Sequence, residues 1–369
     1  MSSTHSHRSV ALAAGVATLS AVVAASIGLG GAASAAPALD LRPHTVYTST
    51  NSATGNQVLE LRSRGGRLTQ VAAVSTGGKG TGGGLGSQGA VVLDGDRLFT
   101  VDAGSNDVAV FAVRGDGDLR LLDRAPSGGL TPVSLSVHGD IVAVLNAGDE
   151  SVTTLRVHGS NLEPVAGSHQ VLAGAGGAEV SFDRSGRRVV VTEKATSDLV
   201  VLPVRHGVLG SPVVSPSEGV TPFGFAIDRH DHVIVTNANG GAAGASSVSS
   251  YSIGHDGALH AVSAAVPTTQ TAACWLAVST DGRFAYDTNA GSGTISRYAI
   301  GHDGSITLVD AVAASPGAGP VDLVATPDSL FTLNGGSHTI SLHAIAADGS
   351  LAAVTAVAVP VGATGLAAG

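Results

Sequence analysis

LAVSTDGRFAYDTNAGSGTISRYAI, residues 276–300, contains the pattern that decides the fold of this chain. A short apolar run is followed by an Asp-Gly turn, a second run ending at Asn289, a turn of small residues and a third run. Short runs rich in β-branched and aromatic residues, bounded by Gly, Asn and Asp, are typical of β-strands joined by tight turns. The stretch therefore predicts three consecutive antiparallel strands.

The same pattern recurs along the chain. A polar anchor residue ends the second run of each copy, and successive anchors are 44 to 52 residues apart: Asn51, Asp102, Asn146, Glu193, Asn237, Asn289 and Asn334. A period of about 40–50 residues is that of propeller blades. The five asparagines are expected to form turns, because Asn caps its own backbone and tolerates left-handed conformations. Seven copies of one unit predict a seven-bladed β-propeller.

Each unit is expected to supply four antiparallel strands. In the third unit the runs lie at 133–137, 141–146, 151–157 and from 161 onward. Asp-Gly pairs in GHDGAL (254–259), GHDGSI (301–306) and AADGSL (346–351) predict hairpin turns between the third and fourth strands, with Gly at positive φ. No helical apolar period persists beyond the N-terminal segment, so the predicted fold class is all-β.

The two ends of the repeat predict how the ring closes. HTVYTST (44–50) has no first strand before it, whereas TGLAA (364–368) matches first-strand positions such as ACWLAV (273–278). The last residues are therefore expected to pair with the strand near Val46 as the innermost strand of the first blade. Such closure removes the exposed sheet edges that a linear repeat would leave.

The N-terminus has the three parts of a secretory signal. Arg8 precedes an apolar stretch at 11–29, and Ala33-Ser34-Ala35 is a small-residue cleavage pattern. We expect a signal peptide at 1–35, a single propeller domain at 36–369, and a secreted protein with no membrane span after signal removal. An uncleaved membrane anchor is the alternative, because the apolar stretch approaches the length that spans a bilayer.

Composition restricts the partners of this chain. The formal net charge is −9 and only two lysines occur, Lys79 and Lys194, so no nucleic-acid partner is expected. A single cysteine, Cys274, excludes an internal disulfide and a multi-cysteine zinc site. No metal and no cofactor are expected. The glycine run GGKGTGGGLG (77–86) lacks the Gly-Lys-Ser/Thr ending of a phosphate loop and predicts a flexible linker between blades one and two.

The repeats resemble a known family. VSFDRSGRRVVVTEKATSDLVVLPV (180–204), residues 276–300 and the DGS turns are similar to the seven-bladed propeller lactonases, which include bacterial 6-phosphogluconolactonases and fungal carboxymuconate lactonising enzymes. TPFGFAID (221–228) and TAACWLAVSTDGRFAYDTN (271–289) resemble a secreted bacterial branch of that family. The resemblance covers residues 40–369 and implies lactone hydrolysis. Two features depart from it, because Ala178 occupies the position of a family histidine and the family's anion-binding basic residues have no clear match.

Candidate functional residues follow from aligning the predicted innermost strands. The ring nearest the channel mouth is formed by Ala90, Ser134, Glu179, Gly224, Trp275, Asp322 and Gly365. Glu179 and Asp322 are the catalytic candidates, because a carboxyl group shielded by apolar neighbours gains a raised pKa and can act as a general base toward water. The alternative is a pair of solvated or ion-binding acids that line the channel.

Substrate-binding candidates surround that ring. Trp275 and Phe223 are expected to form apolar walls, and Glu193 with Lys194 to form a polar hook after the second strand of blade four. For the last two, a surface ion pair is the alternative. Two functions therefore stay open: a secreted hydrolase of a lactone or cyclic ester, and a non-catalytic extracellular propeller that binds a ligand or protein. We expect a monomer with a small-molecule or carbohydrate ligand in its axial channel.

Overall fold

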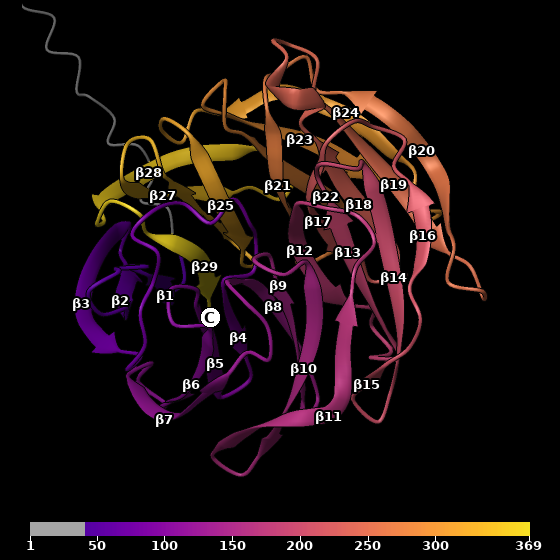
Figure 1. Ribbon diagram of the computed structural model, residues 1–369. Helices are drawn as coiled ribbons and strands as arrows, with labels where there is room; N and C mark the ends of the chain where they lie inside the picture. The colour runs from indigo at the N-terminus through magenta and orange to yellow at the C-terminus, as the bar shows by residue number, and fades with distance from the viewer. Residues whose placement is uncertain (1–40) are drawn as a thin grey trace, which may run out of the picture. The chain divides into compact units, whose positions relative to one another are not determined.

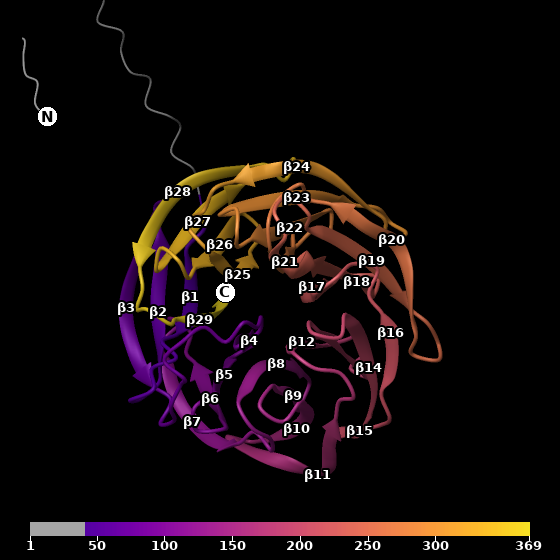
Figure 2. The same cartoon turned by 45° about the horizontal axis from the view of Figure 1, so that its top comes forward.

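Short apolar runs separated by Gly, Asp and Pro form 29 strands in the computed structural model, which describes residues 41–369. These strands build seven antiparallel sheets around one axis (Figures 1 and 2), so the predicted all-β propeller is confirmed. The predicted signal peptide, residues 1–35, lies outside the described residues. No helix within residues 41–369 is long and apolar enough to cross a membrane.

The first three blades are given from the axis outward. Blade 1 consists of β29 (Thr364–Ala368), β1 (His44–Ser49), β2 (Gln57–Arg64) and β3 (Arg67–Ser75). Blade 2 consists of β4 (Val91–Asp94), β5 (Arg97–Asp102), β6 (Asp107–Val113) and β7 (Leu119–Pro126). Blade 3 consists of β8 (Pro132–His138), β9 (Ile141–Asn146), β10 (Ser151–His158) and β11 (Asn161–Val171), as the spacing of the third unit predicts.

The fourth blade differs from the others in its outer strand. Blade 4 consists of β12 (Gly177–Phe182), β13 (Arg188–Glu193), β14 (Asp198–Arg205) and two short pieces on β14, namely β15 (Val208–Leu209) and β16 (Val213–Pro216). Pro212 lies between the two pieces. Because proline has no N–H to donate to the ladder, it explains why the outer strand is interrupted there.

The last three blades have the regular four strands. Blade 5 consists of β17 (Pro222–Ile227), β18 (His232–Asn237), β19 (Ser247–Ile253) and β20 (Leu259–Pro267), with the short 3₁₀ turn η1 (Asn239–Gly241) between β18 and β19. Blade 6 consists of β21 (Ala273–Val278), β22 (Phe284–Asn289), β23 (Thr294–Ile300) and β24 (Ile306–Ala314). Blade 7 consists of β25 (Pro320–Ala325), β26 (Ser329–Asn334), β27 (Thr339–Ile345) and β28 (Leu351–Ala358).

The ring closes through the C-terminal strand. Ala368 pairs with Val46 and Ala367 with Tyr47, and the backbone N–H of Thr45 donates to the carbonyl oxygen of Gly369 at 2.8 Å. Figure 2 shows the C-terminus on the inner side of blade 1, next to β1 and β29. Leu366 is buried in the apolar cluster shared by blades 1 and 7. The predicted closure by residues near Leu366 and Val46 is therefore confirmed.

The apolar cores lie between neighbouring blades. Leu145 of blade 3, for example, is fully buried in one cluster with Val180 and Val191 of blade 4. Because a neighbouring blade lies against each face of a blade, apolar residues can follow one another along a strand, as in β9 (IVAVLN) and β21 (ACWLAV). The hairpin glycines have the expected positive φ, as at Gly304, where φ is 83°.

The anchor asparagines have a different role from the predicted one. Asn51 has a positive φ of 48°, but Asn146, Asn237, Asn289 and Asn334 do not. In those four, the side-chain amide ties the second strand to the third: Asn146 Nδ2 donates to Thr153 Oγ1 at 3.1 Å, and Asn289 Nδ2 donates to Ser296 Oγ at 2.8 Å. The turn prediction is wrong there because each of these anchors is the last residue of its strand and is fully buried, so its amide side chain bonds to the neighbouring strand.

Gly129 has no room for a side chain, because the loop that enters blade 3 passes close to the anchor residue Asn146. A Cβ at Gly129 would lie 2.5 Å from Asn146 Cγ, closer than van der Waals contact allows. Gly129→Ala is therefore expected to lower the free energy of unfolding by about 1–3 kcal/mol, as overpacking does in close-packed interiors. Urea denaturation monitored by circular dichroism measures this. Gly55→Ala is the matched control, because its Cβ would meet nothing within 4 Å; equal stability of the two variants would contradict the prediction.

Candidate functional site

Two predicted catalytic residues line one cavity on the propeller axis. The cavity has a volume of about 240 Å³ and contains Glu179 of β12 and Asp322 of β25. Its lining also includes Gln88 and Gly89, the β4 residues Val91 to Leu93 and the β29 residues Leu366 to Ala368, so it is elongated along the inner strands. Its polar groups gather at the end where the inner strands begin. The opposite end is apolar.

The inner strands share a local distortion that aims these side chains. A β-bulge comes immediately before the equivalent residue in four blades: Ser134, Glu179, Trp275 and Asp322. Bulges re-aim the following side chain relative to the strand. The shared bulge therefore places these residues of the predicted ring at the same level, which is why blades as far apart as 4 and 7 reach a common cavity.

Burial controls the protonation of both carboxyl groups. Asp322 Oδ1 accepts a hydrogen bond from the backbone N–H of Leu323 at 2.8 Å, and Oδ2 is buried without a partner. Burial raises the pKa of Asp322 to about 8. Burial also raises the pKa of Glu179 well above its usual value, and the charge of Asp322 adds to that rise. The hydrogen bond from the N–H of Phe225 to Glu179 Oε2, at 2.6 Å, opposes it. These two groups therefore hold protons at pH values where ordinary carboxyl groups are ionised.

Gln88 closes the polar end of this cavity. Its amide pairs with the backbone of β21 on the far side of the axis, donating to the carbonyl oxygen of Leu276 at 2.9 Å and accepting from its N–H at 3.1 Å. Its own N–H donates to the carbonyl oxygen of Ala178 at 3.3 Å. Figure 2 shows β4, which follows Gln88, at the centre of the ring near β12. A residue from the loop before blade 2 thus bridges blades 4 and 6.

Three of the four binding candidates lie together beside Gln88. The ring of Phe223 meets that of Trp275 edge to face, with centroids 5.2 Å apart. Lys194 Nζ lies 4.9 Å from the centroid of Phe223 and donates to the carbonyl oxygen of Gly86 at 2.7 Å. Burial lowers the pKa of Lys194. This row of side chains lies under the glycine segment, residues 77–88, rather than in the cavity of Glu179 and Asp322.

A scan against family models identifies the fold family. The model described as "Lactonase, 7-bladed beta-propeller" matches residues 44–174 and 235–364, which is more than half of the chain. The chain belongs to this lactonase family. A comparison with curated protein sequences gave no match. The two matched ranges leave out residues 175–234 of the lactonase propeller, which include Glu179, Glu193, Lys194 and Phe223.

Solved structures share the propeller at low sequence identity. A Bacteroides fragilis protein provisionally named a 6-phosphogluconolactonase has a TM-score of 0.71 and 15% identity, over 88% of this chain and 98% of the other. The periplasmic gluconolactonase of Pseudomonas aeruginosa has a TM-score of 0.67 and 17% identity, over 89% and 99%. Virginiamycin B lyase of Staphylococcus aureus has a TM-score of 0.54 and 11% identity, over 73% and 83%. Likeness at this level concerns the fold, which supports several chemistries.

The fourth binding candidate of the lactonase propeller, Glu193, does not line the cavity of Glu179 and Asp322. Glu193 is fully buried at the end of β13, where Thr196 Oγ1 donates to its Oε2 at 3.3 Å. The same carboxylate lies against Gly174, because a Cβ there would be 1.8 Å from Oε2. Burial raises the pKa of Glu193. Its side chain occupies the anchor position of blade 4, so its predicted contact with substrate has no part in the function proposed below.

Hydrogen bonds hold the glycine segment in place, whereas its composition predicts a flexible linker. Thr81 N–H donates to Asn51 Oδ1 at 3.0 Å, and Gly82 N–H donates to the carbonyl oxygen of Asn51 at 2.7 Å. Ser87 Oγ donates to the carbonyl oxygen of Val133 at 2.7 Å. The segment is therefore fastened to blades 1 and 3 and leads Gln88 to the axis. No local sequence pattern indicates this, because its partners are up to 188 residues away in the chain.

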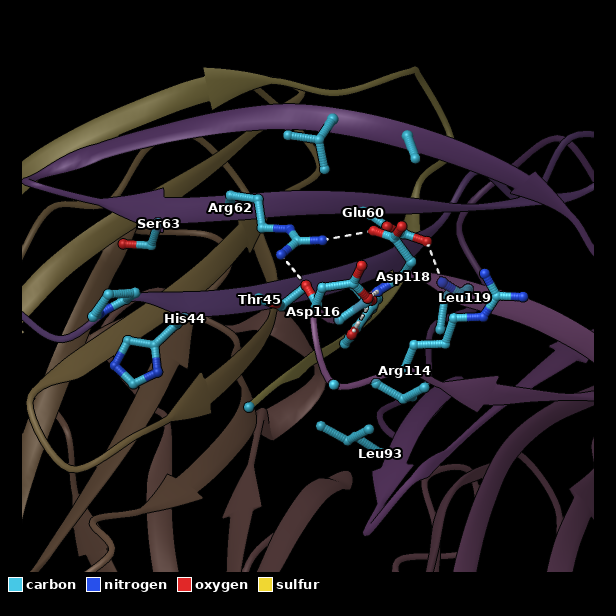
Figure 3. Close-up of a pocket in the computed structure, with 18 of the residues that line it drawn as sticks. His44, Thr45, Glu60, Arg62, Ser63, Leu93, Arg114, Asp116, Asp118 and Leu119 are labelled. Atoms are coloured by element: carbon cyan, nitrogen blue, oxygen red, sulfur yellow. Dashed lines mark hydrogen bonds and ion pairs between the residues drawn. The ribbon is translucent and has the colours of Figure 1, made fainter.

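A larger cavity lies off the axis, between blades 1 and 2. It has a volume of about 950 Å³, and Figure 3 shows Glu60, Arg62 and Asp118 gathered in it. Arg62 Nη2 donates to Asp118 Oδ1 at 2.8 Å, and Glu60 Oε1 accepts from the N–H of Leu119 at 2.7 Å. Tyr47 Oη donates to the carbonyl oxygen of Gly117 at 2.7 Å. These groups fasten blade 1 to the turn of blade 2.

A similar set of hydrogen bonds joins blade 6 to the turn between the third and fourth strands of blade 7. Tyr286 Oη donates to the carbonyl oxygen of Gly349 at 2.8 Å, and Arg297 Nη1 donates to that of Asp348 at 2.6 Å. A repeated tyrosine-to-turn contact indicates a structural clasp between neighbouring blades. Within residues 41–369, no cluster of three or more His, Cys, Asp or Glu side chains is arranged to hold a metal ion.

Proposed function

We propose that this propeller is a secreted hydrolase of a small uncharged lactone, with Glu179 and Asp322 as its catalytic residues. The observation that carries the proposal is the pair of buried carboxyl groups in one cavity, both with raised pKa values. Two like charges in a shared site of low polarity cannot both ionise readily, so such a pair retains a proton near neutral pH. Membership of the lactonase family supports the reaction type.

The retained proton gives the pair two complementary roles. The ionised carboxylate accepts a proton from a water molecule as that water attacks the acyl carbon of the lactone. The protonated carboxyl group then donates its proton to the ring oxygen as the acyl carbon–oxygen bond breaks. Water supplies the hydroxyl group of the new acid and, through the pair, the proton of the new alcohol. The product is an open-chain hydroxy acid.

The lining of the cavity favours a small substrate without charge. No Arg, Lys or His side chain is among the residues that line the cavity of Glu179 and Asp322. An anionic group such as a phosphate would meet two carboxyl groups and no counter-charge. The volume of about 240 Å³ lies just below the range of about 300–1,000 Å³ for drug-sized ligands. Since Gln88 closes the polar end, we place the entrance at the apolar end, near Leu93 and Ala368.

Hydrolysis of paired lactones tests this proposal. The purified mature protein is expected to hydrolyse glucono-δ-lactone faster than its spontaneous rate, measured by proton release against a pH indicator, and to leave the rate for 6-phosphogluconolactone near its spontaneous value. Glu179→Gln and Asp322→Asn are each expected to lower kcat/KM by about 10²–10⁴-fold, the usual contribution of general acid–base catalysis.

Asp287→Asn is the control for these variants, because Asp287 is also fully buried with a pKa raised by burial to about 7, but lies in β22 away from the described cavities. It is expected to retain activity. The absence of turnover on any neutral lactone would favour the alternative, a non-catalytic extracellular propeller that binds a ligand or protein. The bridge that Gln88 forms across the axis is the observation that favours that alternative.

A further inference from the structure

The axial space of the propeller is divided into two cavities. The carboxyl cavity contains Glu179 and Asp322, and the second, which we call the tryptophan cavity, contains Trp275 and has a volume of about 320 Å³. The linings of the two cavities meet at neighbouring positions of three chain segments: Ser87 with Gln88, Val321 with Asp322, and Thr364 with Leu366. Because one strand residue spans only about 3.3 Å, the cavities lie end to end with a thin layer between them.

Gln88 fills the layer between the two cavities. Its side chain reaches from the start of blade 2 to the backbone of Leu276 in blade 6, and only 8% of the residue is exposed. A Cβ at Gly224 would lie 2.4 Å from Gln88 Oε1 and 2.8 Å from Trp275 Cε3. The amide of Gln88 therefore adjoins the Trp275 ring, and no further side chain fits beside them. The side chain of Gln88 is a partition across the axis.

Two hydrogen bonds hold this partition in place. β21 is the innermost strand of blade 6, so the N–H and the carbonyl oxygen of Leu276 have no neighbouring strand on the axial side. Gln88 supplies the partner of each group, at 3.1 and 2.9 Å. If its amide moved away, both buried backbone groups would lose their partner, which is unfavourable. We therefore expect the partition to stay closed when a ligand enters the carboxyl cavity.

The space behind the partition is suited to an alkyl group. Leu333, Val359, Pro360 and Val361 line the tryptophan cavity, and no Asp, Glu, Lys or Arg side chain is part of its lining. The carboxyl cavity alone, at about 240 Å³, lies below the range of about 300–1,000 Å³ that holds drug-sized ligands, whereas the two cavities joined would lie within it. One side chain thus separates a site for a small ligand from a site for an elongated one.

We propose that Gln88 is the specificity-determining residue that limits the length of the ligand at the carboxyl pair; for substrates, this rests on the lactone hydrolysis proposed above. With Gln88 present, a lactone occupies the carboxyl cavity alone, and an alkyl tail on its ring extends toward the entrance near Leu93 and Ala368. Without the Gln88 side chain, the tail passes the axis and is buried against Trp275. Burial of the tail away from water then adds to the affinity.

Two δ-lactones that share one ring test this proposal. δ-Valerolactone has no tail, and δ-decalactone has the same ring with a pentyl tail. The ratio of kcat/KM for δ-decalactone to kcat/KM for δ-valerolactone is expected to rise by about tenfold or more in Gln88→Ala, the usual worth of a filled apolar subsite. An unchanged ratio, with both lactones hydrolysed, would overturn the length limit and leave the lactonase function standing.

Gln88→Met is the matched control for this variant. Both substitutions remove the two hydrogen bonds to Leu276, but methionine is an unbranched side chain of similar length and still fills the layer. The ratio for Gln88→Met is therefore expected to stay near that of the wild type. An equal rise in both variants would mean that loosening of the ring, and not the opened gap, admits the tail, and it would contradict the proposal.

An equilibrium measurement separates this proposal from the lactonase function. 2-Pentyltetrahydropyran keeps the ring and tail of δ-decalactone but has no ester bond, so its binding is measured by calorimetry without turnover. Gln88→Ala is expected to bind it about tenfold more tightly than Gln88→Met does, even if neither lactone is hydrolysed. Equal affinity would overturn the proposal. If Gln88→Ala does not fold, the wild type decides: a kcat/KM that is about tenfold higher for δ-decalactone than for δ-valerolactone would contradict a closed partition, and a ratio that does not rise with the tail would support it.

Discussion

Deletion of residues 363–369 is expected to abolish the cooperative unfolding transition of the whole propeller. The deletion removes β29, the innermost strand of blade 1, together with its pairing to Val46, Tyr47 and Ser49. It also removes Leu366, whose burial alone is worth about 1.5–3 kcal/mol. Native domains are stable by only about 5–15 kcal/mol, so loss of a strand and of ring closure together exceeds what the fold tolerates.

The apolar clusters show why the effect would not stay local. Leu366 belongs to the cluster shared with Phe331 of blade 7, and Ala367 belongs to the one shared with Phe111 of blade 2. The deletion therefore opens the interfaces on both sides of blade 1. Circular dichroism during thermal unfolding measures the outcome, and a variant that keeps a single sharp transition near the wild-type Tm would contradict the prediction.

A circular permutant separates loss of the strand from loss of the C-terminus. Residues 361–369 are placed before residue 44 and joined to it by an Asn-Gly turn. Gly369 and Thr45 already exchange backbone hydrogen bonds at 2.8 and 3.0 Å, so a tight hairpin connects them without strain. This permutant is expected to fold, because it keeps every strand. If it unfolded like the deletion variant, the covalent connection between blades 7 and 1 would matter more than the strand.

Asp322→Asn is expected to change the pH dependence of stability between pH 5 and pH 8. Burial raises the pKa of Asp322 in the folded protein to about 8, against 3.8 as the usual value. Between these values the folded state binds more protons at this site than the unfolded state, so rising pH destabilises the wild type. The loss approaches about 1.4 kcal/mol per pH unit, because one unit of pKa is worth that much.

The variant lacks this dependence because its amide does not titrate. The free energy of unfolding of Asp322→Asn minus that of the wild type should therefore increase with pH and level off above pH 8. Urea denaturation at several pH values measures the difference. Asp281→Asn is the control: hydrogen bonds from Ser279 and Arg283 lower the pKa of Asp281 to about 2, so its contribution is lost only as pH falls toward that value. Parallel curves for Asp322→Asn and the wild type would contradict the raised pKa.

The position of the carboxyl pair could be predicted in part. The alignment of inner strands placed Glu179, Trp275 and Asp322 in one ring, and the shared bulge bears out their equivalence. Sequence alone did not separate them into two cavities, because the partition is Gln88, which reaches the axis from the glycine segment. Its partner Leu276 is 188 residues away, and no short-range pattern carries such a contact.

The blade count, the strand order and the closure by residues 364–368 can be predicted from the amino-acid sequence, because they depend on the repetition of local patterns of apolar runs and turns. Which polar groups become buried away from water depends on how distant segments pack against one another. Glu193 and Glu179 are both acids near the start or end of inner blade-4 strands, yet one faces Gly174 at an interblade loop and the other faces the axial cavity. Burial and neighbouring groups set pKa values, and both are properties of packing between distant segments.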